Sequence, residues 1–199
     1  MSRVLAAEHR SAIVAAAIRL MAREGVAAAS TRRVAAEAGV AQATIHYVFG
    51  TKTELYRGVL ETVSANLVRA VEAGLEPQSQ WAEQAEGAAR AVWEITEADP
   101  STALLLVELT AYALRHEELR DLAEGLYESY QRLAEDVVRI LLATSDRELR
   151  IPLEEVARLA VAGLNGVVLS FLVHGDRDRS RRDIENLVDS LTGVAVGTV

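Results

Sequence analysis

The sequence predicts an all-α fold in two parts, and three observations support that prediction. Apolar residues recur at helical spacing along nearly the whole chain. Half of the 199 residues are hydrophobic but only 5% are aromatic, and only three prolines are present, which favours helices over strands. A helix-turn-helix spacing lies near the N-terminus, so we expect a three-helix domain at residues 1–52 and a larger helical domain at 53–199.

Residues 30–52 carry the most informative pattern, STRRVAAEAGVAQATIHYVFGTK. Ala35, Gly39 and Ile45 fall at relative positions 1, 5 and 11, the spacing of a helix-turn-helix. Alanine is small where the second helix would cross, and glycine adopts a left-handed turn without Cβ strain. Isoleucine would pack the second helix onto the first. The pattern predicts a domain that reads the major groove of DNA.

The other helices follow from apolar stripes between start and stop signals. Ser30 or Thr31 caps the second helix, and a capping box from Thr51 to Glu54 starts the fourth. The first expected helix ends at Gly25, and a polar joint is expected at 75–80. The other expected helices cover 31–38, 42–49, 52 to about 74, 81–93, 104–114, 119–140, 152–173 and 184–191.

Residues 159–173 are apolar on nearly every face of their predicted helix. A membrane span is the alternative interpretation, and Asn165, Ser170 and the short length of the stretch argue against it. A helix that is apolar all round must be covered on all sides. One arrangement that covers it faces the helix toward the core and a partner subunit together.

The net charge of −8 divides unevenly along the chain. Residues 1–57 hold eight Lys and Arg against four Glu, a net of +4, and the remainder carries −12. Many globular domains are acidic, and +4 is a modest excess. The positive sign nevertheless falls on the segment with the helix-turn-helix, where attraction to phosphate would require it.

Composition and spacing exclude several kinds of site. With no cysteine, disulfides and thiolate metal sites are excluded, which fits a reducing cytoplasm. The apolar stretch 12–18 is short and flanked by arginines, so we expect no signal peptide and a soluble cytoplasmic protein. The four histidines lie far apart, so we expect no metal site, no cofactor and no catalytic constellation. The arginines of 177–182 are interleaved with Asp176, Asp178 and Asp183, which favours a solvated loop and helix start over a second nucleic-acid site.

Several segments together match a known family. Arg-Glu-Gly at 23–25, Ser-Thr-Arg-Arg-Val-Ala-Ala-Glu-Ala-Gly-Val at 30–40, Ala-Thr-Ile at 43–45, Tyr47, Phe49 and Lys52-x-x-Leu55 resemble the TetR family of bacterial transcriptional regulators. These motifs cover about the first quarter of the chain, and the later helices fit the family in number, length and order. The resemblance implies a homodimer, usually a repressor, that binds a near-palindromic operator and releases it when a small molecule fills a pocket in the C-terminal domain. It also implies that the last two long helices, about 153–174 and 180–196, pair across the dimer axis.

The candidate DNA contacts divide by helix face. At 42–49, Ala43, His46 and Tyr47 share one side, whereas Ile45 and Phe49 should point into the core. Gln42 and Thr44 can hydrogen-bond base edges or phosphates at the helix start, and glutamine suits adenine in the major groove. The side chains that suit phosphates, which fix register, are Thr31, Arg32 or Arg33, Tyr47 and Lys52. For His46 two interpretations stay open, a contact to a base or phosphate and packing at the edge of the interface. The predicted DNA-binding residues are Thr31, Arg32, Arg33, Gln42, Ala43, Thr44, His46, Tyr47 and Lys52. Histidine at 46 and valine at 48 depart from the family pattern, which leaves the operator sequence open.

Large or polar-tipped residues on otherwise apolar helices are the candidates for a ligand pocket. They are Trp93, Glu108, Tyr112, Tyr127, Tyr130 and Asn165. The competing interpretation makes each one a core residue or a satisfied polar group at the dimer interface. Few charges lie on the inner faces, which indicates a largely apolar ligand.

The sequence therefore predicts a ligand-responsive, DNA-binding transcriptional regulator that is not an enzyme. We expect a repressor that a small, largely apolar molecule releases from its operator. Two alternatives stay open. One is a constitutive DNA-binding protein without a ligand, and the other is an enzyme or small-molecule carrier with a vestigial helix-turn-helix.

Overall fold

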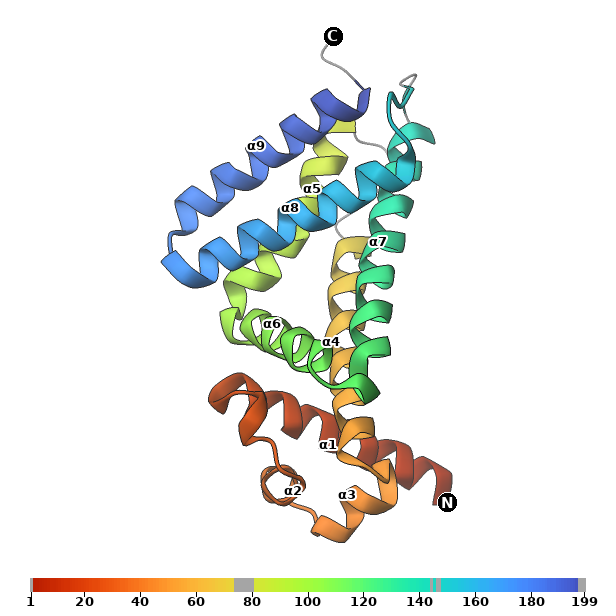
Figure 1. The fold of residues 1–199 in the computed structure, drawn as a ribbon, viewed down its shortest axis with the longest axis vertical. Helices are drawn as coiled ribbons and strands as arrows, with labels where there is room; N and C mark the ends of the chain where they lie inside the picture. Colours follow the sequence, from red (N-terminus) through yellow and green to blue (C-terminus); the bar gives the residue numbers. More distant parts are fainter. Residues whose placement is uncertain (1, 74–80, 144, 146–147, 197–199) are drawn as a thin grey trace. The chain divides into compact units, whose positions relative to one another are not determined.

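The computed structural model describes residues 2–73, 81–143, 145 and 148–196, and its regular structure is helical throughout those ranges (Figure 1). The predicted all-α fold is confirmed, and the predicted joint at 75–80 lies outside the described residues. The helices are α1 Ser2–Glu24, α2 Thr31–Ala38, α3 Gln42–Phe49, α4 Lys52–Ala73, α5 Trp81–Ala98, α6 Pro100–Leu114, α7 Arg120–Ala143, α8 Leu153–His174 and α9 Arg177–Val196, with single 3₁₀ turns η1 Val26–Ala28 and η2 Glu117–Leu119.

The chain forms two compact units. The first unit is Met1–Ala65 with Ser101–Leu126, and the second unit is Asn66–Pro100 with Tyr127–Val199. This division by contacts differs from the predicted boundary after residue 52, because α4 continues without a break and α6 joins the first unit. The assignment of residues 1–52 to DNA reading stays a prediction about function.

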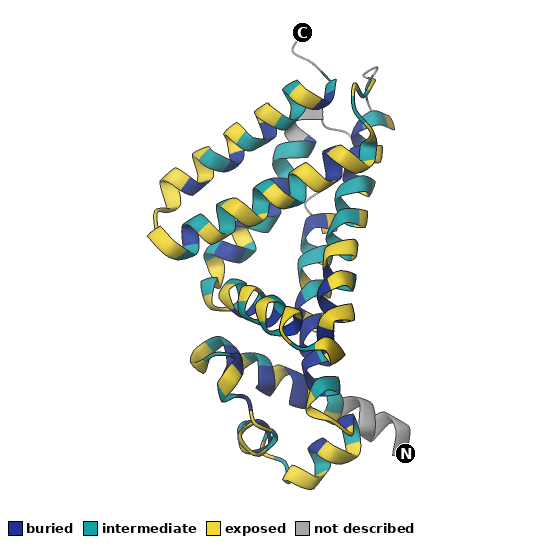
Figure 2. Ribbon diagram, in the orientation of Figure 1, coloured by how far each residue is buried: buried dark blue, intermediate teal, exposed yellow. Residues whose placement is uncertain are grey.

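The predicted apolar stripe of α1 forms the centre of the first unit. Ile13, Ala16 and Ala17 are fully buried, and Leu20 and Met21 are at most 2% exposed. Figure 2 shows the buried positions along one side of α1. The helix ends at Glu24, and Gly25 follows it with a φ of 84°.

The turn between α2 and α3 has the predicted glycine geometry. Gly39 adopts a φ of 67°, and its N–H donates to the Ala36 carbonyl at 3.2 Å. The N–H of Val40 donates to the Ala35 carbonyl at 3.0 Å, so the two donors close the end of α2 as in a Schellman motif. A side chain at position 39 would force a left-handed backbone that only glycine adopts freely.

Two helix caps refine the predictions. The Ser30 hydroxyl accepts from the Arg33 N–H at 3.3 Å, so serine rather than Thr31 is the cap of α2. The Thr51 hydroxyl accepts from the Glu54 N–H at 3.1 Å, which is half of the predicted capping box. Instead of returning to the cap, the Glu54 carboxylate accepts from Arg57 Nε at 3.3 Å.

The second unit packs α5 and α7 with α8, α9 and the end of α4. Helices α8 and α9 lie side by side and run in opposite directions (Figure 1). Gly163 permits their close approach, because a Cβ there would lie 2.5 Å from Leu187 Cδ1. Beside them, Trp93 packs edge-to-face on Phe171 with ring centroids 4.8 Å apart.

One face of helix α8 is an apolar stripe that is exposed in the single chain. Leu159, Leu169 and Val173 are 47%, 49% and 68% exposed, and Ala162 and Gly166 lie between them on the same face. With 22 residues and a mean hydropathy of 1.9, α8 is long and apolar enough to cross a membrane by length and composition. The predicted argument from short length concerned the apolar stretch 159–173, and the whole helix is longer because it starts at Leu153, as the predicted start at Pro152 implies.

Candidate functional site

Helix α3 has one buried face and one exposed face, as predicted. Ile45 and Phe49 are 1% and 5% exposed and hold the helix on the first unit. Ala43 and His46 are exposed, and Tyr47 is 79% exposed. An exposed tyrosine of this size has no packing role within the unit, so the outer face of α3 is the part available to a partner.

The first residues of α2 and α3 are tied together. Gln42 Nε2 donates to Thr31 Oγ1 at 3.2 Å, and both side chains lie at helix starts. Thr44 is half-buried one turn into α3. The N–H groups of a helix start favour anions, so these polar positions suit contacts to phosphate as well as to base edges.

The two neighbouring arginines of α2 have different surroundings. Arg33 forms an ion pair with Glu24, whereas Arg32 is exposed and has no ion-pair partner among the described residues. The hydrogen bond from Arg33 lowers the pKa of the Glu24 carboxyl below its ordinary value. Arg32 is therefore the more available cation of the two.

The ion pair of Arg33 belongs to a small network between α1 and α2. Arg23 donates to Glu37 at 3.0 Å and to Glu24 at 3.2 Å, and Arg19 approaches Glu37 at 3.5 Å. The hydrogen bond from Arg23 lowers the pKa of the Glu37 carboxyl. Several basic residues of the positive segment are thus paired with carboxylates of the same unit.

Lys52 lies at the predicted position in the first turn of α4. Its side chain is exposed, and Nζ lies 4.8 Å from the centre of the Tyr56 ring. No carboxylate pairs with this lysine among the described residues. Tyr56 is itself buried and donates from its hydroxyl to the Val26 carbonyl at 3.0 Å, so the ring beneath the ammonium is fixed.

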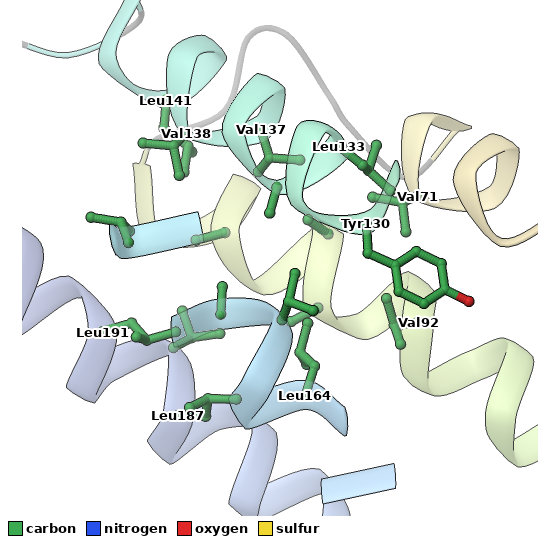
Figure 3. Close-up of a pocket in the computed structure, with 18 of the residues that line it drawn as sticks. Val71, Val92, Tyr130, Leu133, Val137, Val138, Leu141, Leu164, Leu187 and Leu191 are labelled. Atoms are coloured by element: carbon green, nitrogen blue, oxygen red, sulfur yellow. The ribbon is translucent and has the colours of Figure 1, made fainter. Parts of the chain in front are cut away.

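A pocket of about 160 Å³ lies within the second unit (Figure 3). Five helices supply its described walls, and the polar side chains among the described lining residues are those of Tyr130, Asn165 and Thr192. These described lining residues include no Asp, Glu, Lys, Arg or His. The lining residues are Leu67 and Val71 of α4; Ala85, Ala88, Ala89 and Val92 of α5; Tyr130, Leu133, Ala134, Val137, Val138 and Leu141 of α7; Val156, Ala160, Val161, Leu164 and Asn165 of α8; and Leu187, Val188, Leu191, Thr192 and Ala195 of α9.

The structure brings two of the six candidate ligand residues to this pocket, Tyr130 and Asn165. Trp93 is buried against Phe171 in the neighbouring cluster, and Tyr127 is 47% exposed outside the lining. Searching for polar tips on apolar helices missed the aliphatic residues that make most of the wall. Their stripes indicate burial, and a stripe alone does not tell a pocket wall from a filled core.

Glu108 and Tyr112 lie in the first unit and hold other elements. The Glu108 carboxylate accepts from the Val26 N–H at 2.9 Å, next to the positive φ of Gly25. Tyr112 packs edge-to-face on Tyr56 at 5.4 Å between centroids. Neither residue lines the pocket, and both connect α6 to elements of the helix-turn-helix unit.

We expect Glu108→Ala to lower the free energy of unfolding by about 1–3 kcal/mol, because the half-buried N–H of Val26 loses its acceptor. Glu108→Gln retains a carbonyl oxygen and should lose less. Urea denaturation followed by circular dichroism measures both variants. Loss of ligand binding in Glu108→Ala at unchanged stability would instead support a direct role with ligand.

The arginine-rich segment at the start of α9 is engaged within the second unit. Arg181 donates to Glu97 at 2.8 Å, and Arg179 approaches Asp183 at 3.7 Å. The Asp176 carboxylate accepts from the Arg179 N–H at 3.0 Å and caps the helix. As predicted, the segment is the start of a helix, and its arginines are exposed to solvent. Among the described residues, no three His, Asp or Glu side chains are grouped to hold a metal ion.

Comparison with known proteins adds independent information. The model of "Bacterial regulatory proteins, tetR family" matches residues 13–59, and that of "Tetracyclin repressor-like, C-terminal domain" matches residues 80–194. The chain is 26% identical to the HTH-type nicotine-responsive transcriptional repressor HdnoR of Paenarthrobacter nicotinovorans. The alignment of 189 residues covers 94% of this chain and 96% of the repressor.

Solved structures with this fold include the multidrug binding protein EbrR complexed with ethidium. That protein is 30% identical, with a TM-score of 0.66 and coverage of 90% of this chain and 98% of its own. A TetR-family transcriptional regulator from Rhodococcus sp. has a TM-score of 0.82 at 19% identity, covering 93% of this chain and 98% of its own. The second likeness shows the fold alone.

Proposed function

The chain belongs to the TetR family of bacterial regulatory proteins, and from that premise we propose that it is a repressor whose operator affinity falls when a small, largely apolar molecule occupies the pocket. The observation that best supports this proposal is the pocket of about 160 Å³ in a chain whose helix α3 also has an exposed face. A nicotine-responsive repressor and a multidrug-binding relative support a response to small molecules. We propose a cytoplasmic protein that regulates by binding and catalyses no reaction.

We propose that two copies associate through α8 and α9. The exposed stripe of Leu159, Leu169 and Val173 supports this, because a soluble chain covers an apolar face of that size. No described residue outside the adjacent backbone of α8 has a heavy atom within 4 Å of a Cβ placed at Gly166, which leaves room for a partner helix. A two-fold dimer would present two α3 helices to successive major grooves of a near-palindromic operator, about 34–36 Å apart.

Release would follow from a shift in population between two conformations. Ligand favours the one in which the two α3 helices no longer match the groove spacing, and it lowers affinity only by its preference for that conformation. The effector should therefore weaken operator binding by about 5-fold to 150-fold at saturation.

Gel shift with DNA from the promoter region of the chain's own gene tests the proposal. We expect a specific complex with a dissociation constant on the order of 10⁻⁸ M or tighter at physiological salt, and its release by compounds that raise the melting temperature of the free protein. A complex that no stabilising compound releases favours the constitutive alternative. Absence of any specific complex favours a small-molecule carrier.

A further inference from the structure

We infer that the partner subunit completes the wall of the pocket at Asn165, so that a bound ligand and the second copy of the chain meet at this residue. This role of Asn165 rests on the proposed function, because it requires two copies that are paired through α8. Three observations support it. Asn165 is an exposed residue of the pocket wall, it adjoins the exposed stripe of α8, and the neighbouring Gly166 leaves space for a second helix.

Asn165 differs in exposure from the rest of the described pocket wall. Of the 22 described lining residues, Asn165 alone is exposed, and the others are buried or half-buried. Water therefore reaches the wall at this position in the single chain. A molecule that covers Asn165 would close the least covered part of the described wall.

On helix α8, Asn165 lies between the pocket face and the exposed stripe. Residues four apart are neighbours on a helix surface. Val161, four residues before Asn165, lines the pocket, and Leu169, four residues after it, belongs to the stripe and is 49% exposed. A single residue thus separates the interior of the pocket from the surface that is proposed to pair with the partner.

The opposite side of α8 is already covered within the chain. Gly163 precedes Asn165 by two residues, a rotation of about 200° around the helix axis. A Cβ at Gly163 would lie 2.5 Å from Leu187 Cδ1 of α9, and Leu187 itself lines the pocket (Figure 3). A Cβ at Gly166 would meet no described residue within 4 Å beyond the adjacent backbone of α8. The uncovered side of α8 is therefore the side beside Asn165.

The spacing of the stripe directs a second helix to this side. Its residues follow one another at intervals of three and four, which is the pattern of a seam between paired helices: Leu159, Ala162, Gly166, Leu169 and Val173. The middle of the seam has the smallest side chains, so two helices can approach closely there. In a two-fold dimer the same contact occurs in both copies, so each subunit would close the pocket of the other.

A ligand that touches both subunits binds the dimer more tightly than the monomer. By linkage, it strengthens the dimer by the same factor. The gain comes from apolar ligand surface that the partner covers, and a contact of one or two methylene groups corresponds to about fivefold in affinity.

Because the chain contains no cysteine, single thiols can report on the cover at position 165. Asn165→Cys places a thiol at the inferred contact. Asp136→Cys is the control, because Asp136 lies outside the described lining on α7 and its side chain is 67% exposed. In the dimer, fluorescein maleimide should modify the thiol at 165 roughly tenfold more slowly than the thiol at 136. Adding Leu169→Arg to form monomers should abolish this protection at 165 and leave the rate at 136 unchanged.

Propylbenzene tests whether position 165 also belongs to the pocket. It is an uncharged single ring of the kind that apolar cavities of this volume take. At saturation it should slow modification at 165 in the monomeric double variant, where no partner covers the thiol, and leave the rate at 136 unchanged. Titration calorimetry should show about fivefold weaker binding of propylbenzene to Leu169→Arg than to the wild-type dimer.

Sedimentation velocity establishes the state of each variant. Rapid modification at 165 in a dimer overturns the inference and leaves the proposed function standing. The inference is also overturned if propylbenzene fails to slow modification at 165 in the monomer, or if it binds dimer and monomer equally. A double variant that stays dimeric contradicts the pairing through α8 and overturns the inference with it. If every expected result is obtained but compounds that bind the pocket leave the operator complex intact in a gel shift, the proposed function fails and the inference stands.

Discussion

Replacing Leu169 with arginine is expected to convert the proposed dimer into monomers. Leu169 is 49% exposed at the middle of the α8 stripe, and two-fold symmetry would bring the stripes of both copies together. Two buried arginines would then face each other without carboxylates, which the interface does not tolerate. Because the dimer binds two half-sites at once, operator affinity should fall by roughly 100-fold or more.

Sedimentation velocity and gel shift measure these two effects. Leu104→Arg is the matched control, because Leu104 is 44% exposed on α6 and the same substitution there should leave the dimer and operator binding unchanged. A dimeric Leu169→Arg protein with normal operator affinity would contradict pairing through α8. By length and composition α8 could also span a membrane. Purification of the wild-type chain as a dimer from the soluble fraction, without detergent, would favour a dimer interface over a membrane span.

The helix-turn-helix was predictable because each of its constraints is local. The turn needs a residue at positive φ at one fixed position, and Gly39 supplies it. Ile45 and Phe49 are buried because they are four residues apart on a short helix. The sequence spacing therefore determines both the turn and the exposed face.

The pocket was much less predictable because five helices distant in sequence build it. Its aliphatic residues have the same periodicity as any core residue, so pattern alone does not identify them. Polar-tipped residues were a partial guide. Tyr130 and Asn165 line the pocket, but Glu108 accepts from the Val26 N–H in the other unit. A carboxylate can contact a ligand or accept a hydrogen bond from the backbone. Only the fold shows which group lies beside the carboxylate of Glu108.

The net charge of the N-terminal segment overestimates the number of cations that are free to contact phosphate. The positive excess of residues 1–57 is real, but Arg19, Arg23 and Arg33 pair with Glu24 and Glu37. These pairs connect residues 9 to 18 positions apart, across the turn that joins α1 to α2, and their partners are not evident from the sequence. Ion pairing therefore reduces the number of cations that remain for phosphate.

Replacing Arg32 with alanine should weaken operator binding, and replacing Arg33 should do so much less. Arg32 is exposed without an ion-pair partner among the described residues, whereas Arg33 is held by Glu24. Loss of one phosphate contact at each half-site removes about 1 kcal/mol twice, or about 30-fold for the dimer. Arg33→Ala sacrifices a surface ion pair, which contributes about 0–1 kcal/mol to folding.

The salt dependence separates a lost DNA contact from a damaged domain. Each phosphate contact contributes about 0.9 to the slope of log affinity against log salt, so Arg32→Ala should reduce the slope of the dimer by about 2. Lys52→Ala should produce the same reduction, because Lys52 is also an exposed cation without a carboxylate partner in the described chain. A variant that merely unfolds the domain loses active protein while the remainder keeps the wild-type slope. The opposite result, in which Arg33→Ala reduces the slope of log affinity against log salt and Arg32→Ala does not, would contradict the prediction. It would mean that the ion pair between Arg33 and Glu24 breaks when the protein binds DNA, and that the exposure of an arginine in the free protein does not identify a phosphate contact.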